Sequence, residues 1–146
     1  MQTITVPIQL DDLATLPTYL HDGDSGADLS AAIKHPIILY PNERKLIPTG
    51  LRMPPPVGTE WQIRPRSGLA LKHGITVLNP PGTIDSPFLG MIGVILINHS
   101  EQPFTIEPGM RIAQAVLAPV LRAQFEVVDT LPETERGSSG FGSTDQ

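Results

Sequence analysis

The stretch "TEWQIRPRSGLALKHGITVLN", residues 59–79, combines the local structures that we expect throughout the chain. Trp61 and Ile63 alternate with polar residues, and this period of two is typical of a half-buried strand. The segment "SGLALKHG" that follows is the only helical pattern, with Ser67 placed to cap the helix and Gly74 placed to end it. The stretch therefore predicts a strand, a short helix and a second strand.

Outside this stretch, short β-rich pieces alternate with turns. Pro and Gly, 16 and 13 of the 146 residues, are spread along the chain rather than gathered in one linker. Regularly spaced strands separated by turns predict an all-β sandwich or barrel, the jelly roll among them, with one short helix. The β-rich pieces are "TITVPIQL", "PIILY", "KLIPTGLRM", "TEWQIR", "GITVLN", "MIGVILIN", "FTIEPG", "IAQAVLAPV" and "FEVVDTL".

The apolar pattern stops near Leu131. We therefore expect a single β domain over residues 1–130 and a flexible C-terminal arm over residues 131–146. The composition of that arm, rich in Gly, Ser and Thr, is by itself typical of a solvent-exposed tail.

Composition narrows the classes of function. The net charge of −5 argues against broad contact with nucleic acid, although a local cluster of arginines can still bind a small anion. The absence of Cys excludes disulfides and thiolate metal sites. No charged leader precedes an apolar run, and "MIGVILI" is too short to span a bilayer. We expect a cytoplasmic protein that binds neither nucleic acid nor membrane.

Two polar segments carry candidate binding residues. In "DSGADLSA", residues 24–31, Asp28 is either a turn residue or a carboxylate that anchors the water shell of Mg²⁺. In "RPRSGLA", Arg64 and Arg66 precede the start of the expected helix. Backbone N–H groups at a helix start and forked guanidinium donors both suit phosphate oxygens, but a capped helix with surface arginines explains the pattern equally well.

Two further positions allow a structural and a chemical interpretation. The segment 78–98 resembles a hairpin, and Asp85 at its turn is either a turn residue or a base that accepts a proton from water. Gln114 lies among apolar neighbours, so its amide needs a partner, which is either a backbone group or a ligand.

Taken in order, these segments resemble the five motifs of the homotrimeric dUTPases. The match extends over residues 24–144, with the order and spacing of the motifs preserved. The matching segments are "DSGADLSA", "PRSGLA", "GTIDSPFLGMIGVILIN", "GMRIAQ" and "RGSSGFGST".

The resemblance implies a distorted jelly roll assembled as a homotrimer with shared active sites. It also implies Mg²⁺-dependent hydrolysis of dUTP to dUMP and pyrophosphate, which keeps uracil out of DNA and supplies dUMP for thymidylate synthesis. Asp85 matches the residue that activates the attacking water, and Asp28 the residue that holds metal-bound water. The implied substrate-binding residues are Arg66, Ser67, Gly68, Asn79, Gly82, Ile84, Phe88, Gln114, Arg136, Phe141, Gly142, Ser143 and Thr144.

The resemblance also gives the arm a function. Arg136 matches an arginine that grips the γ-phosphate, and Phe141 a ring that lies over uracil. The arm then closes over the substrate as a lid, in an active site formed with neighbouring subunits. Pro119 stands where such an arm leaves its own subunit.

The chain departs from the family pattern at several positions. Phe88 replaces a Tyr whose ring packs on the sugar, so we expect discrimination against UTP to survive. Met110 replaces a common Asp, which puts an ion pair to Arg111 in doubt. Pro87 and Leu89 replace polar residues, and Ser139 replaces a Gly of the lid.

Two other functions fit the same fold class. One is a dCTP deaminase, although residues 79–98 offer Asp85 and no Glu for that chemistry. The other is a non-catalytic, nucleotide-binding regulatory trimer, against which the retention of Asp85 and of the Arg136 and Phe141 arm argues.

Overall fold

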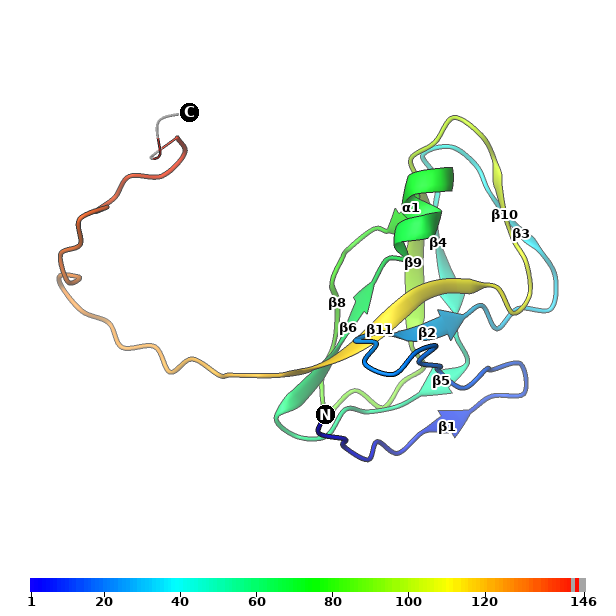
Figure 1. Ribbon diagram of the computed structural model, residues 1–146, viewed down its shortest axis with the longest axis horizontal. Coiled ribbons are helices and arrows are strands. Elements are labelled where there is room, and N and C mark those ends of the chain that lie inside the picture. The colour runs from blue at the N-terminus through cyan, green and yellow to red at the C-terminus, as the bar shows by residue number, and fades with distance from the viewer. Residues whose placement is uncertain (143, 145–146) are drawn as a thin grey trace.

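The computed structural model describes residues 1–142 and residue 144. It consists of short strands and one helix, with the C-terminal segment extending away from the body (Figure 1). This confirms the expectation of an all-β fold with one short helix. The elements are β1 Gln9–Leu10, β2 Ala27–Ser30, β3 Ile37–Leu39, β4 Arg44–Pro48, β5 Leu51–Arg52, β6 Thr59–Arg64, α1 Ser67–His73, β7 Ile75–Val77, β8 Gly82–Ile84, β9 Gly93–Asn98, β10 Phe104–Ile106 and β11 Arg111–Pro119.

Early strands pair with late strands. β2 pairs with β11, β3 with β10 and β4 with β9, all antiparallel. The larger sheets have the orders β2-β11-β6-β8 and β4-β9-β7. This nested pairing of the two halves of the chain is the arrangement of a jelly roll, in which two antiparallel sheets face each other.

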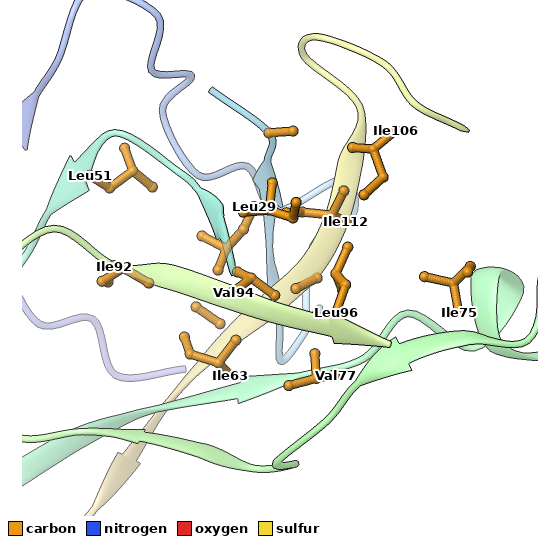
Figure 2. Close-up of a cluster of buried hydrophobic side chains, with 14 of the residues drawn as sticks. Leu29, Leu51, Ile63, Ile75, Val77, Ile92, Val94, Leu96, Ile106 and Ile112 are labelled. Carbon is orange, nitrogen blue, oxygen red and sulfur yellow. The ribbon is translucent and has the colours of Figure 1, made fainter. Parts of the chain in front are cut away.

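The core lies between the two larger sheets. β9 follows the strand period, since Val94 and Leu96 are buried while Ile95 and Ile97 are only partly covered. Their side chains meet those of Leu29 from β2, Ile63 from β6 and Ile112 from β11 (Figure 2). Alternating burial therefore fixes which face of β2, β6 and β11 points outward, and the candidate site lies on that outer face.

The helix ends as expected but begins differently. Gly74 has φ +66° and its N–H donates to the Ala70 carbonyl, so the predicted C-terminal stop is confirmed. The predicted cap at Ser67 is wrong. Arg66 takes the extended conformation of the N-cap without a side-chain cap bond, and Ser67 is already the first helical residue. This arrangement leaves the Ser67 side chain exposed beside Arg66.

The predicted hairpin over residues 78–98 is present at its ends, but β8 is not one of its strands. β7 pairs antiparallel with β9, and the Leu78 N–H donates to the Ile95 carbonyl at 2.9 Å. β8 pairs with β6, whereas β9 pairs with β4 and β7, so the two strands belong to different sheets. The chain crosses from one sheet to the other between residues 84 and 93, since β8 joins the sheet of β6 and β9 joins the sheet of β4 and β7. A small cavity lies between β8 and β9 as a result.

The two ends of the chain contain less regular structure than their sequence predicts. Only Gln9–Leu10 of the β-rich segment 3–10 forms a strand. The segment 125–131 forms none, because it leaves the body after β11 and meets no sheet edge of its own chain (Figure 1). In the part of the chain that the structure describes, no helix has the length and apolar character of a membrane span.

Candidate active site

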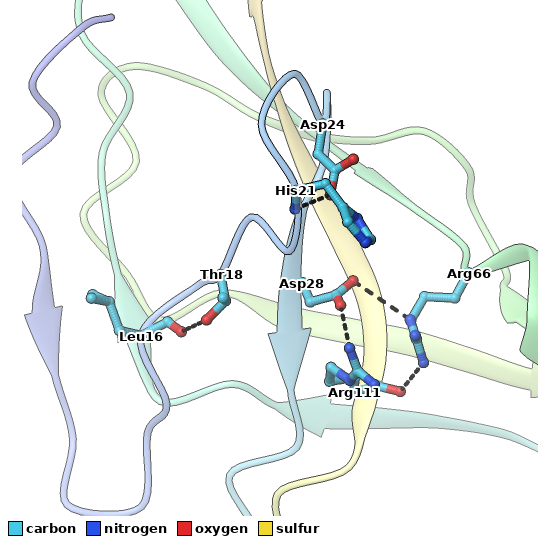
Figure 3. A network of polar contacts seen from close by, with 7 residues as sticks. All are labelled: Leu16, Thr18, His21, Asp24, Asp28, Arg66 and Arg111. Carbon is cyan, nitrogen blue, oxygen red and sulfur yellow. Dashed lines mark hydrogen bonds and ion pairs between the residues drawn. The ribbon is translucent and has the colours of Figure 1, made fainter.

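Three charged side chains from distant parts of the sequence meet on the outer face of β2 and β11. We call Asp28, Arg66 and Arg111 the arginine cluster. Asp28 Oδ2 lies 3.1 Å from Arg111 Nη1, and Asp28 Oδ1 lies 3.5 Å from Arg66 Nε (Figure 3). Arg66 Nη1 also donates to the Arg111 carbonyl at 3.2 Å. The structure thus brings together residues from three of the motif segments. Position 110 offers no carboxylate to Arg111, but Asp28 forms an ion pair with it.

A β-bulge in β11 makes this cluster possible. Arg111 pairs with Ser30 and Ala113 pairs with Leu29, so Ile112 is an extra residue in the ladder. In a regular strand, residues 111 and 114 would point to opposite faces because the side-chain period is two. The extra residue places Arg111 and Gln114 on the same face as Asp28.

The backbone of Asp28 is held on both sides. On one side it pairs with Gln114 of β11. On the other, its N–H donates to the Thr18 carbonyl at 2.9 Å, in an isolated bridge to the preceding loop. Within that loop, the His21 backbone N–H donates to Asp24 Oδ2 at 2.9 Å and lowers the pKa of Asp24 (Figure 3). These contacts fix the position from which the Asp28 carboxylate reaches the arginines.

Gln114 is positioned by a backbone contact and by a glycine. Its Nε2 donates to the Pro65 carbonyl at 3.0 Å, which confirms a backbone partner for this amide. Its Oε1 occupies the place that a Cβ at Gly26 would need. A Cβ at position 26 would therefore displace the end of the Gln114 side chain, which packs directly on the Gly26 backbone.

Ser67 and Gly68 lie exposed at the start of α1, next to Arg66. The first helical backbone bond comes from the Ala70 N–H to the Arg66 carbonyl. The backbone N–H groups of Ser67 and Gly68 therefore lack an intrahelical acceptor, as is usual in a first turn.

A second group of predicted residues lies around β8. Asn79, Gly82 and Ile84 line a cavity of about 70 Å³ between β8 and β9. Asp85 follows β8 and is exposed, and its carbonyl accepts from the Phe88 N–H in a turn. The Phe88 ring packs close to Gly90: a Cβ on that residue would lie 2.6 Å from Phe88 Cζ. The absence of a side chain at Gly90 therefore leaves room for the ring.

The third group lies on the C-terminal segment. Arg136 Nε donates to the Ser139 carbonyl at 2.9 Å within a local turn, and Phe141, Gly142 and Thr144 are exposed. Ser143, also predicted to bind substrate, lies outside the described residues. None of the described arm residues contacts the other two groups in this single chain.

The first two groups lie at opposite ends of one sheet. Ile84 pairs with Trp61, which places Asp85 opposite Glu60, whereas Asp28 is level with Arg64 across β11. Three strand spacings and four residue positions separate the main chains of Asp85 and Asp28, about 20 Å by ordinary sheet dimensions. One chain therefore cannot bring Asp85 to the arginine cluster.

The described residues contain no group of three or more His, Cys, Asp or Glu side chains able to hold a metal ion. Asp28 is the one carboxylate of the arginine cluster, and each of its oxygens already faces a guanidinium. Each oxygen keeps a second lone pair, so a water molecule bound to an ion can still donate to it. This donor set fits Mg²⁺ only if phosphate oxygens and water supply most of the ligands.

Comparisons with known proteins agree on one family. The family model described as dUTPase matches residues 12–145. A deoxyuridine 5'-triphosphate nucleotidohydrolase of Chlamydia pneumoniae is 58% identical over 97% of this chain and 98% of its own length. A dUTPase mutant of Staphylococcus bacteriophage 80alpha, solved with dUpNHpp, has a TM-score of 0.83 at 25% identity and covers 97% of this chain and 99% of its own.

A dUTPase mutant from phage phi11 of S. aureus, whose structure shows the coordination of a structural Mg(II) ion, has a TM-score of 0.79. It is 21% identical and covers 87% of this chain and 98% of its own. At that identity, the likeness supports the fold alone.

Substituting Gly26→Ala tests the packing of Gln114. The added methyl overlaps Gln114 Oε1 and must displace the side chain from Pro65, so we expect a loss of about 1–3 kcal/mol of stability. The double variant Gly26→Ala with Gln114→Ala removes the overlap, and its stability loss should be smaller than the sum of the two single losses. Thermal unfolding at one protein concentration measures all three, and strictly additive losses would contradict the contact.

Proposed function

The chain belongs to the dUTPase family, and on that premise we propose that it hydrolyses dUTP to dUMP and pyrophosphate with the residues described below. The arginine cluster is the observation that carries the assignment of the phosphate site. The chain has a net charge of −5, yet two guanidiniums converge on one outer face with a single carboxylate between them. Such a local excess of positive charge suits a polyphosphate in an otherwise acidic protein.

The phosphate chain binds at the arginine cluster and the start of α1. Arg66 offers forked donors that match phosphate oxygens, and it is only partly engaged by Asp28. Ser67 and Gly68 add a hydroxyl and backbone N–H groups beside it. Gln114, held by Pro65 on the same face, adds its amide.

The uracil ring of the substrate binds at the residues around β8. Asn79, Gly82 and Ile84 border a cavity small enough that a 5-methyl group on the pyrimidine meets a wall. A polar rim of backbone and amide groups rejects a cytosine amine because donors would then face donors. The Phe88 ring packs beside the sugar and leaves no room for a 2′-hydroxyl.

Asp85 supplies the base for the chemical step. Its exposed carboxylate accepts a proton as water oxygen bonds to the α-phosphorus. The bond from the α-phosphorus to the bridging oxygen breaks, and pyrophosphate leaves with that electron pair. Arg66 and the neighbouring N–H groups offset the charge that develops on the phosphates.

The site is assembled from several copies of the chain. The arginine cluster, the β8 group and the arm lie apart in one chain, so a homotrimer that shares its sites brings them together. The segment 120–130, which precedes the arm, carries large apolar side chains that are almost fully exposed, with Phe125 at 92% and Val127 at 99%. Side chains of this kind mark a contact surface, and a second copy of the chain is the occupant that the shared site requires.

The arm closes the site. Arg136 grips the γ-phosphate, Phe141 covers the uracil, and Gly142, Ser143 and Thr144 complete the phosphate contacts. On this proposal, residues 120–130 cross to a neighbouring subunit, and residues 131–146 form the lid.

Mg²⁺ binds with the triphosphate. When bound, the ion neutralises phosphate charge and orients the phosphate chain. Asp28 is the residue of this chain that reaches the ion, through a bound water molecule.

The function is tested by pyrophosphate release from dUTP, UTP, dTTP and dCTP, each with Mg²⁺ and with EDTA. We expect rapid release from dUTP with Mg²⁺ and little from the other three. Asp85→Asn removes the base and should lower turnover by about 10²–10⁴-fold while dUpNHpp still binds. Ammonia release from dCTP, or binding of dUTP without turnover, would instead indicate a deaminase or a regulatory protein.

Ending the chain at Glu135 tests the lid. The truncated protein keeps β1–β11 and the exposed apolar segment, so its trimer and its melting temperature should be unchanged. Turnover of dUTP should fall by at least about 10²-fold, because the γ-phosphate and uracil contacts of the arm are lost. Normal turnover of a truncated trimer would remove the arm from the active site.

A further inference from the structure

Asp28 is the common partner of two cations. Its side chain is 13% exposed, whereas those of Arg66 and Arg111 are 29% and 45% exposed. The carboxylate is thus the most buried group of the cluster, and both guanidiniums point toward it (Figure 3). Arg66 and Arg111 are tied a second time, because Arg66 donates to the Arg111 carbonyl.

The charges do not balance. One carboxylate and two guanidiniums leave an excess of one positive charge on this face. Each guanidinium has five N–H donors, and the contacts within the cluster use one from Arg111 and two from Arg66. The remaining donors, on partly exposed groups, are available to an anion.

The same geometry makes Asp28 a poor primary partner for a cation. A hydrated Mg²⁺ ion that approaches Asp28 also approaches two guanidiniums, and like charges at such distances repel. The carboxylate interacts more closely with the arginines than it can with an ion that it reaches only through water.

We propose that Asp28 is a positioning residue which holds Arg66 and Arg111 together as a paired phosphate-binding site, and that this action does not depend on metal. Arg111, which precedes the bulge in β11, is the second phosphate-binding arginine. The inference rests on the proposed function, since it concerns how the same site holds the triphosphate.

The test measures binding of dUpNHpp to the full-length trimer by calorimetry, once with Mg²⁺ and once with EDTA. Asp28→Asn leaves the two arginines without their shared anion, so binding should weaken by about tenfold in EDTA and by at least that factor with Mg²⁺. Arg111→Gln should weaken it similarly. The double variant should lose little more than either single variant, because both changes disable one unit.

Arg52→Gln is the matched control. Arg52 forms an ion pair with Asp11 away from the cluster, so binding should be unchanged in both buffers. Melting temperature and trimer mass are measured for every variant. If Asp28→Asn does not fold, Arg111→Lys decides, since it keeps the charge but loses the forked donor. Weaker binding of dUpNHpp in EDTA then supports the pairing, and unchanged binding overturns it.

Four other results would overturn the proposal. Weakening by Asp28→Asn with Mg²⁺ alone would mean that the residue acts only through the ion. Additive losses in the double variant would mean that Asp28 and Arg111 act separately. If the unsubstituted protein does not bind dUpNHpp in either buffer, the proposed function is overturned as well. If the unsubstituted protein binds dUpNHpp and hydrolyses dUTP, but Asp28→Asn has no effect on binding, this inference alone is overturned.

Discussion

The separation of Asp85 from the arginine cluster along one sheet is the constraint on which the functional account depends. The strand register sets this separation. Asp85 follows the last residue of β8, near the start of β6, whereas Asp28 is level with Arg64 at the end of β6. Side chains cannot cross about 20 Å, so if Asp85 is the catalytic base and the arginine cluster binds phosphate, the two groups of one chain belong to two different active sites. On the proposed function, assembly is therefore part of the catalytic machinery and not an addition to it.

The same constraint explains the C-terminal segment. A chain that completed its own site would have no use for a segment that leaves the body after β11 and exposes Phe125 and Val127 to solvent. Its β-type sequence forms no strand because a strand needs an edge, and this segment meets none in its own chain; on the proposed function, another copy supplies that edge. The dUTPase family model matches residues 12–145, so the match extends through the C-terminal segment, which fits this arrangement.

Sequence predicted the elements better than their pairing. Alternation predicted β6, and Gly74 predicted the helix end, because both depend on local geometry. The hairpin prediction at 78–98 holds at the ends of the segment, where Leu78 pairs with Ile95, but β8 pairs with β6 instead, because pairing depends on residues that lie far apart in the sequence. Regular alternation of side chains along β11 would place residues 111 and 114 on opposite faces of the sheet. Only the bulge at Ile112 brings Arg111 to Asp28, so Arg111 was missed as a binding residue.

Subunit mixing tests the central claim most directly. Asp85→Asn and Arg66→Gln trimers, each inactive alone, are unfolded together, refolded and assayed for pyrophosphate release from dUTP. If each site takes its base and its phosphate cluster from different subunits, random trimers should regain about a quarter of the unsubstituted turnover. No recovery in mixed trimers of confirmed composition would show that one chain builds the whole site, and would contradict the account.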